Sequence, residues 1–307
     1  MYSQITDFTR NSYKKNITKH KKTNYFALKI YQNYCSLTGI FHQFPNYLII
    51  GAAKCGTGSL YRYLNQHPKI KPALTKEVRF FDKYYDRGIN RYRVSFPFKD
   101  LLKRNYVTGE ATPRYLDHPH APKRIKAVIP NARFIVLLRN PIERAYSMYN
   151  MRVRRHRENL SFEEAIKQEK KRTEGEFKRM ELDENYYSRP YFHHAYLDRG
   201  IYVDKLKHWM SFFPKEQFLI IKSEELFKNT SETYNKVLKF LALPPHELNS
   251  YPIQGQINKM KPIDPSLRKQ LTEFFKPHNE RLYKFLGKNF DWESKIYEKH
   301  NSENVKL

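Results

Sequence analysis

The residues from Gly51 to Ser59, Gly-Ala-Ala-Lys-Cys-Gly-Thr-Gly-Ser, combine the chemical groups that bind a phosphate-like anion. Glycines let the backbone approach a ligand closely, so that N–H groups can point at it. Lys54 adds a positive charge, and the hydroxyls of Thr57 and Ser59 can donate hydrogen bonds. The segment follows an apolar run and precedes a helical pattern, so the positive end of a helix dipole would face the same anion. We therefore expect an anion site between a strand and a helix.

The order of the polar residues distinguishes this loop from the Walker A loop of kinases and ATPases. A Walker A loop needs Gly-Lys-Ser/Thr in sequence, which places the lysine on the outer phosphates and the hydroxyl on Mg²⁺. Here Lys54 precedes Gly56, and Thr57 follows that glycine directly. Kinase chemistry is therefore disfavoured, and a P-loop nucleotide kinase stays as an alternative hypothesis.

The chain is strongly basic, with 57 Lys and Arg against 31 Asp and Glu, a formal charge of +26 over 307 residues. Such an excess indicates an anionic partner: nucleic acid, an acidic membrane surface, a polyanionic sugar or a charged nucleotide. A hydrophobic fraction of 40% argues against a disordered polycation, which has too little apolar surface to fold. A non-catalytic protein that binds nucleic acid or another polyanion is a further hypothesis, although no nucleic-acid-binding motif is recognisable.

Signals for cellular location are few. Only Cys35 and Cys55 are present, which excludes a disulfide framework. The first two dozen residues lack the continuous apolar stretch of a signal peptide, and no run is apolar enough to span a membrane. We expect a cytoplasmic protein, and one without a metal, because no His, Cys or Asp cluster has the spacing of metal ligands.

Buried-strand runs and helical patterns alternate along the chain. We expect strands at residues 47–50, 133–138 and 218–221, and helices at 60–66, 161–174, 201–212, 231–241 and 266–286. Asn140 and Pro141 predict a helix start after the second strand, and Pro277 predicts a break in the last helix. The alternation is typical of an α/β fold, a three-layer domain whose central, mostly parallel sheet is flanked by helices. We divide the chain into a basic N-terminal extension (1–44), one domain (45–295) and a C-terminal tail (296–307).

Further motifs follow the loop in a fixed order. They are Lys76-Glu77-x-x-Phe80-Phe81, Gly109-Glu110-x-Thr112-Pro113-x-Tyr115, Arg139-x-Pro141-x-x-Arg144-Ala-x-Ser147, and then Gly200-x-Tyr202, Trp209 and Glu224-Glu-Leu226. Together with the loop, these motifs resemble the sulfotransferases that use 3′-phosphoadenosine 5′-phosphosulfate (PAPS), and most closely the heparan sulfate type. The resemblance runs from about residue 45 to 291 and implies a P-loop-like fold.

The resemblance assigns roles to individual residues. Glu77 would be the catalytic base that takes the proton of the acceptor, and Lys54 would stabilise charge on the sulfuryl and leaving-group oxygens. Arg139 would clamp the 3′-phosphate at the carboxyl end of a strand, where open α/β sheets bind ligands. The residues implied to bind PAPS are Lys54, Cys55, Gly56, Thr57, Gly58, Ser59, Arg139, Ser147, Tyr202, Lys259 and Lys261.

Several alternatives stay open at this point. Glu110 could be the base, or a partner of Lys54. Another branch of the family uses a histidine base, for which the candidates outside any matching motif are His118, His120, His193 and His194. Two departures from the heparan type are that residues 257–262 lack its cysteine pair and Lys-Gly-Arg loop, and that Ala111 stands where the 3-O-sulfating subgroup has lysine.

The resemblance thus implies an enzyme that moves a sulfuryl group from PAPS to a hydroxyl or amine, with a carbohydrate as the favoured acceptor, by in-line displacement. The acceptor would be a glycan or a small hydroxylated metabolite, and we expect neither a nucleic-acid partner nor a membrane span. The missing membrane anchor suggests a soluble microbial relative of the heparan-type enzymes.

Overall fold

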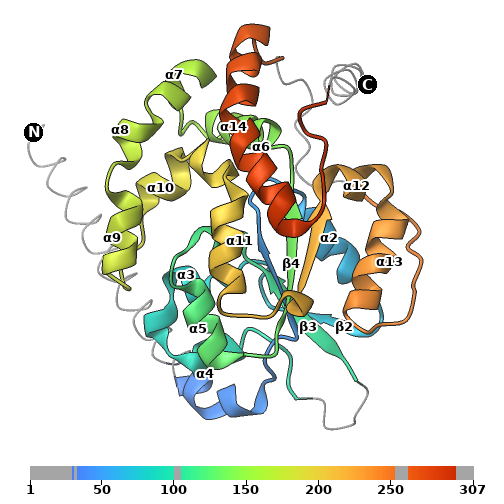
Figure 1. Cartoon of the computed structure of the whole chain (residues 1–307). Helices are drawn as coiled ribbons and strands as arrows, with labels where there is room; N and C mark the ends of the chain where they lie inside the picture. The colour runs from blue at the N-terminus through green and yellow to red at the C-terminus, as the bar shows by residue number, and fades with distance from the viewer. Residues whose placement is uncertain (1–29, 31–32, 100–104, 253–261, 295–307) are drawn as a thin grey trace, which may run out of the picture.

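Five parallel strands in the order β2-β3-β1-β4-β5 form the centre of the computed structural model, which describes residues 30, 33–99, 105–252 and 262–294 (Figure 1). The strands are β1 (Tyr47–Gly51), β2 (Ile70–Pro72), β3 (Val107–Ala111), β4 (Arg133–Leu138) and β5 (Phe218–Lys222). Every neighbouring pair is parallel. The expected α/β class with a parallel sheet is confirmed.

The two central strands are buried on both faces. All five residues of β1 are buried, as are all residues of β4 after its first. A strand covered by helices on both sides has no solvent face, so it is apolar throughout instead of alternating. This explains why the runs at β1 and β4 predict strands. The run at β5 is apolar as well, although three of its five residues are only partly buried, and the sequence patterns do not predict β2 or β3. β3 carries threonine, glycine and glutamate, and its partner β1 determines its conformation through a register that pairs Leu48 with Glu110.

Helices cover both faces of the sheet. Figure 1 shows α2, α12 and α13 on one side and α3, α5 and α11 on the other. In chain order the helical elements are η1 (Gly39–Phe41), α2 (Thr57–Leu64), α3 (Phe80–Lys83), η2 (Tyr85–Arg87), α4 (Ile89–Arg93), η3 (Tyr115–Asp117), α5 (Ala121–Val128), α6 (Pro141–Arg154), α7 (Phe162–Lys167), α8 (Glu169–Thr173), α9 (Glu176–Leu182), α10 (Arg189–His194), η4 (Asp198–Gly200), α11 (Tyr202–Met210), η5 (Lys215–Gln217), α12 (Ser223–Lys228), α13 (Thr230–Phe240) and α14 (Pro265–Leu286).

The start of α6 agrees with its sequence signal. The Asn140 side chain accepts the backbone N–H groups of Ile142 at 2.9 Å and Glu143 at 3.3 Å, and Pro141 occupies the first helical position. Proline fits there because that residue needs no hydrogen-bond donor. The helix start after β4 is therefore confirmed.

Two helix predictions were wrong in detail. The helix expected at 161–174 is divided at Gln168 into α7 and α8. The carboxylate of Glu169, the first residue of α8, accepts the N–H groups of Leu197 and Asp198. The last helix does not break at Pro277 but continues as α14 through Leu286. Pro277 lies on the exposed side, whereas Leu271, Phe275 and other residues pack on α6 and α11, so tertiary packing offsets the lost hydrogen bond.

Candidate active site

The loop after β1 has the backbone conformation of an anion cradle. Gly56 has φ +87° and precedes α2, and Lys54 has φ +74°. A left-handed conformation costs a residue with a Cβ roughly 1–2 kcal/mol, so the fold holds Lys54 against a local preference. Thr57 and Ser59 are buried in the first turn of α2. A Cβ at position 56 would meet the Phe227 ring at 2.9 Å, so glycine is required for both space and backbone angle.

Cations surround Lys54. Burial, together with the neighbouring charges of Arg139, Arg154 and Arg155, lowers the pKa of Lys54 to about 8. Arg154 is the last residue of α6 and Arg155 caps it, so neither belongs to a motif that the sequence singled out. Positive charges placed close to a partly buried lysine repel one another and raise the electrostatic energy of the site. An anion that binds between them relieves this repulsion, so the cluster favours anion binding.

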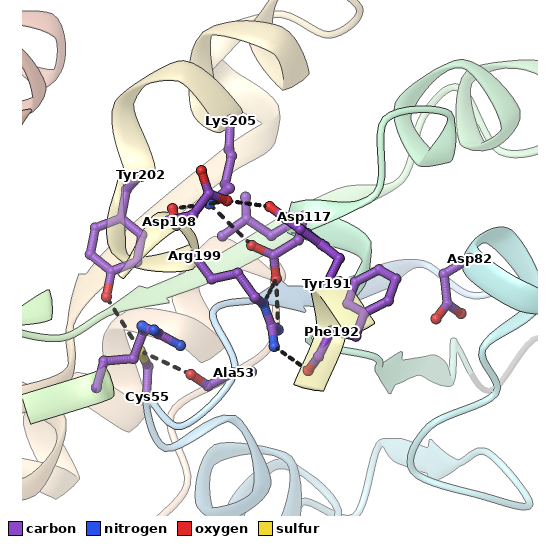
Figure 2. Close-up of polar contacts among 12 residues, drawn as sticks. Ala53, Cys55, Asp82, Asp117, Tyr191, Phe192, Asp198, Arg199, Tyr202 and Lys205 are labelled. Atoms are coloured by element: carbon purple, nitrogen blue, oxygen red, sulfur yellow. Dashed lines mark hydrogen bonds and ion pairs between the residues drawn. The ribbon is translucent and has the colours of Figure 1, made fainter. Parts of the chain in front are cut away.

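Tyr202 joins the loop to the end of β4. Its hydroxyl donates a hydrogen bond to the Arg139 carbonyl at 2.8 Å. The same hydroxyl lies 4.0 Å from the Cys55 sulfur (Figure 2). Ser223, at the end of β5, donates to the Cys55 carbonyl at 3.0 Å. These contacts link the segments that follow β1, β4 and β5, at the carboxyl edge of the sheet that carries Lys54 and Arg139.

Two predicted ligands face the interior. Cys55 is fully buried, and burial raises the pKa of its thiol to about 11, so the side chain stays an uncharged thiol. Tyr202 is buried, and its hydroxyl donates a hydrogen bond to the Arg139 carbonyl. We conclude that these two side chains shape the loop, and that only the backbone of Cys55 could face a ligand.

Arg139 and Ser147 are the two residues predicted to bind the second phosphate of the donor. The Arg139 side chain is 27% exposed and lies 3.9 Å from the Glu143 carboxylate, which also accepts a 2.7 Å contact from Arg268 of α14. Ser147 is buried in the second turn of α6. Glu143 holds Arg139 only loosely, so an incoming phosphate can compete for the guanidinium.

The two candidate bases have opposite environments. Glu77 is 38% exposed, and its Oε1 lies 2.9 Å from the Lys76 Nζ. Glu110 has no exposed surface and accepts four hydrogen bonds, from the Val78 N–H at 3.0 Å and the hydroxyls of Thr112, Tyr92 and Tyr115. Burial raises the pKa of Glu110 to about 7, although these four donors favour its ionised form.

Glu110 and its strand place Glu77 at the edge of the sheet. The Ala111 N–H donates to the Lys76 carbonyl at 2.8 Å, and the Glu110 carboxylate accepts the Val78 N–H, so Glu77 is bounded on both sides by bonds to β3. Because β3 pairs with β1, this is the same carboxyl edge that carries the Lys54 loop. The sequence contained both glutamates, but the dependence of one on the other is visible only in the fold.

Arg199, Asp117 and Lys205 form a buried ion-pair network. Arg199 donates to Asp117 from Nε at 2.9 Å and from Nη2 at 2.8 Å, and its Nη1 donates to the Phe192 carbonyl of α10 (Figure 2). The Lys205 Nζ lies 3.4 Å from the same carboxylate. Although burial opposes it, the charges of Arg199 and Lys205 lower the pKa of Asp117 below its usual range. None of these residues lies in the motifs that indicated the site.

The four histidines considered as alternative bases differ in their surroundings. Burial and Arg124 lower the pKa of His118 to about 3, and burial and Arg152 lower that of His193 equally far. His118 is buried beside the Phe192 ring, which is the position of a packing residue. The His120 Nε2 donates a hydrogen bond to the Met180 carbonyl at 2.8 Å, and the His194 Nδ1 lies 3.6 Å from the Glu158 carboxylate.

The remaining predictions concern two lysines near the C-terminus, a metal site and a membrane span. Lys259 and Lys261 fall outside the described residues. Among the residues that the structure describes, we find no group of three His, Cys, Asp or Glu side chains that could hold a metal ion. Within that same part of the chain, none of the helices combines the length and apolar character needed to span a membrane.

Comparison with known proteins gives a consistent result. A family described as the sulfotransferase domain matches residues 44–305. The membrane-associated sulfotransferase kil1 of Dictyostelium discoideum is 26% identical over 81% of this chain and 67% of its own length. Human heparan sulfate glucosamine 3-O-sulfotransferase 3B1 is 30% identical over 82% of this chain and 65% of its own length. The chain therefore spans about two thirds of the length of these relatives.

A solved structure is similar over most of the described fold. The crystal structure of a sulfotransferase from Alicyclobacillus acidocaldarius superposes with a TM-score of 0.62 at 30% identity, covering 82% of this chain and 100% of that one.

Proposed function

This chain belongs to the sulfotransferase family, and we propose that it transfers a sulfuryl group from PAPS to a hydroxyl or amine of a carbohydrate. The observation that carries the proposal is the arrangement of Lys54 and Arg139 at the shared edge of β1 and β4, with Tyr202 joining the two segments. Two cationic segments held at one edge suit a nucleotide with charged groups at two positions, because each group needs its own donors.

In the proposed step, Glu77 takes the proton of the acceptor while the acceptor oxygen or nitrogen attacks sulfur. The new bond to sulfur forms as the bond between sulfur and the 5′-phosphate oxygen breaks, and that oxygen keeps the electron pair. Lys54 would neutralise the charge that develops on the leaving phosphate. With a pKa of about 8, the Lys54 ammonium is largely protonated near neutral pH and can play this part.

The environments of the two glutamates support Glu77 as the base. Its carboxylate is partly exposed at the sheet edge, where an acceptor can reach it. Glu110 is fully buried with both oxygens occupied by donors, so an acceptor hydroxyl would first have to displace them. We assign Glu110 the role of a positioning residue for the segment that bears Glu77.

Basic side chains beside Glu77 favour an anionic acceptor. Burial lowers the pKa of Arg114 to about 10, with Arg79 and Arg199 acting in the same direction and Glu77 opposing them. Desolvation and neighbouring positive charges destabilise the charged form of Arg114, and an acidic group bound close to it would stabilise that form. An acidic glycan would supply that group, in line with the heparan sulfate named for the human relative.

Calorimetry with 3′-phosphoadenosine 5′-phosphate (PAP) tests the donor site. We expect PAP to bind without Mg²⁺ and ATP to bind far more weakly. Lys54→Ala combined with Arg139→Ala should lower PAP affinity about 100-fold, because hydrogen bonds to charged groups contribute roughly 1.5–3 kcal/mol each. Lys178→Ala removes an exposed lysine on α9 and should leave affinity unchanged. Unchanged PAP binding in the double variant would contradict the site, and Mg²⁺-dependent ATP binding would favour the kinase alternative.

Transfer of labelled sulfate from PAPS tests the reaction itself. A panel that contains an acidic glycan, its neutral counterpart and small hydroxylated metabolites would identify the acceptor class. We expect transfer to the acidic glycan to be fastest. Tight binding of the glycan with no transfer from PAPS to any acceptor would favour the non-catalytic polyanion-binding alternative.

A further inference from the structure

An apolar surface lies far from the sheet edge described above. Eleven large apolar side chains are exposed in the described part of the chain. Five of them lie between residues 30 and 41, and a sixth, Phe98, stacks on His42 at the end of that segment. We call this region the N-terminal apolar face; its members are Ile30, Tyr34, Leu37, Ile40, Phe41 and Phe98. Large exposed apolar patches are uncommon on soluble domains and indicate contact with a partner or a membrane.

The face is built on one side of a helical segment. Residues 33–38 are helical and continue into η1. Cys35, Gly39 and His42 point to the interior and are buried, whereas Tyr34, Leu37 and Phe41 point outward, and Leu37 is 73% exposed. Both sets follow helical spacing, so one side of the segment packs against the domain while the other presents apolar side chains outward.

Contacts with the domain hold this segment in place. The Lys99 N–H donates to the Phe41 carbonyl at 2.8 Å, and the His42 ring stacks on Phe98 at 4.1 Å, which brings Phe98 into the face. The Arg93 guanidinium donates to the carbonyls of Ile40 and His42. The outward side chains are therefore presented on a fixed support.

The charges around the face are mostly positive. Residues 85–99, which flank it, contain Arg87, Arg91, Arg93 and Lys99 against the single acid Asp86. Residues 1–29, which precede it in the sequence, contain seven lysines and arginines against one aspartate. An apolar surface with a basic surround complements a bilayer of anionic lipid, which offers acyl chains to the apolar groups and headgroup charge to the cations. A protein partner would need a matching acidic rim around an apolar patch of its own.

From this combination we propose that the N-terminal apolar face binds the surface of membranes that contain anionic lipids. Figure 1 shows the blue segment that carries η1 below α4, at the opposite end of the molecule from α6. The face precedes β1, whereas the Lys54 loop follows it, so the two lie at opposite ends of the strand. When the protein is bound to a membrane through this face, the Lys54 loop and Glu77 would be directed away from the lipid. The inference is independent of the proposed sulfuryl transfer.

Vesicle co-sedimentation of the full chain tests the proposal. The probes are vesicles of equal parts phosphatidylcholine and phosphatidylglycerol, and vesicles of phosphatidylcholine alone. We expect the protein to bind the anionic vesicles preferentially and to be released as salt concentration rises. Leu37→Asp with Phe41→Asp should weaken binding about tenfold or more, since two side chains lose their burial in lipid. Leu37→Gln with Phe41→Gln keeps the net charge and should weaken binding for the same reason.

The matched control exchanges the same residue types elsewhere. Leu182→Asp with Phe274→Asp makes an equal charge change at exposed positions on α9 and α14 and should leave vesicle binding unaltered. Equal losses in both double variants would overturn the proposal, because charge alone would then explain binding. Failure to bind anionic vesicles would also overturn it, and a dimer in solution that Leu37→Asp with Phe41→Asp dissociates would assign the face to a second copy of the chain. Circular dichroism checks that each variant is folded.

Discussion

The Glu110 carboxylate accepts the backbone N–H of Val78 at 3.0 Å, one residue beyond Glu77. A buried side chain of β3 thus fixes the backbone on which the proposed base is carried. The Thr112 hydroxyl donates to the same oxygen, and two tyrosine hydroxyls donate to the other, so the carboxylate has no capacity to spare.

Glu110→Gln should therefore reduce both stability and turnover. The amide nitrogen would face existing donors, and a buried group left unsatisfied costs about 1–3 kcal/mol, measured as a lower midpoint of denaturant unfolding. We expect kcat to fall about tenfold with PAP affinity unchanged, because Glu77 is displaced while the Lys54 loop is not. Tyr92→Phe removes one donor only and serves as the milder comparison. Wild-type kcat in Glu110→Gln would refute the positioning role.

Glu77→Gln should remove most turnover while leaving the donor site intact. A positioned general base contributes typically about 10²–10⁴-fold in rate. Single-turnover transfer of labelled sulfate measures this loss, and PAP calorimetry provides the control. Equal losses of rate and PAP affinity would indicate a structural role. Glu163→Gln, at an exposed pair on α7, should change neither quantity.

PAP affinity should fall as pH rises through the range around 8. The pKa of Lys54 is lowered to about 8 in the free protein, so the ammonium that attracts the anion is lost above that pH. A bound anion raises this pKa, hence binding takes up a proton and affinity declines, at most about tenfold per pH unit. The Cys55 thiol, with a pKa of about 11, titrates outside this window. Lys54→Met should bind more weakly with a flat profile between pH 7 and about 9. A slope retained in that variant would assign the titration to another group.

Gly56→Ala should weaken PAP binding, because the new methyl meets Phe227 at 2.9 Å and the backbone has φ +87°. Gly175→Ala is a matched control: Gly175 also precedes a helix with positive φ, +68°, but its Cβ would enter open space. Both variants should lose about 1–2 kcal/mol of stability from backbone strain. Only Gly56→Ala should lose PAP affinity as well. Equal affinities in the two variants would mean that the loop does not contact the nucleotide.

Removing one partner of the buried pair Asp117–Arg199 should be strongly destabilising. Arg199→Met removes both hydrogen bonds of the guanidinium and leaves the buried Asp117 carboxylate with the charges of Lys205 and Arg144, and such losses typically amount to about 3–5 kcal/mol. Lys123→Met removes an exposed pair with Glu184 and should cost less than about 1 kcal/mol. Urea unfolding of both variants makes the comparison. Similar midpoints would show that the pair contributes little beyond packing.

The parts of this protein that the sequence predicts are those controlled by short-range chemistry. The loop from Gly51 to Ser59 lies between a strand and a helix, and Asn140 with Pro141 starts α6, because glycine, asparagine and proline restrict the backbone wherever they occur. The apolar runs of β1 and β4 predict strands for a related reason: a strand covered on both faces must be apolar throughout.

Other features depend on partners far away in the chain. β3 is a strand because it pairs with β1, and Pro277 is tolerated in α14 because buried neighbours on both sides hold the helix. The low pKa of Lys54 and the division of labour between Glu77 and Glu110 follow from burial and from charges brought together by folding. Residue types and spacing therefore determined which groups could do the chemistry. Only the tertiary structure decided which are exposed and which support them, because desolvation and charge proximity arise from segments that meet in space.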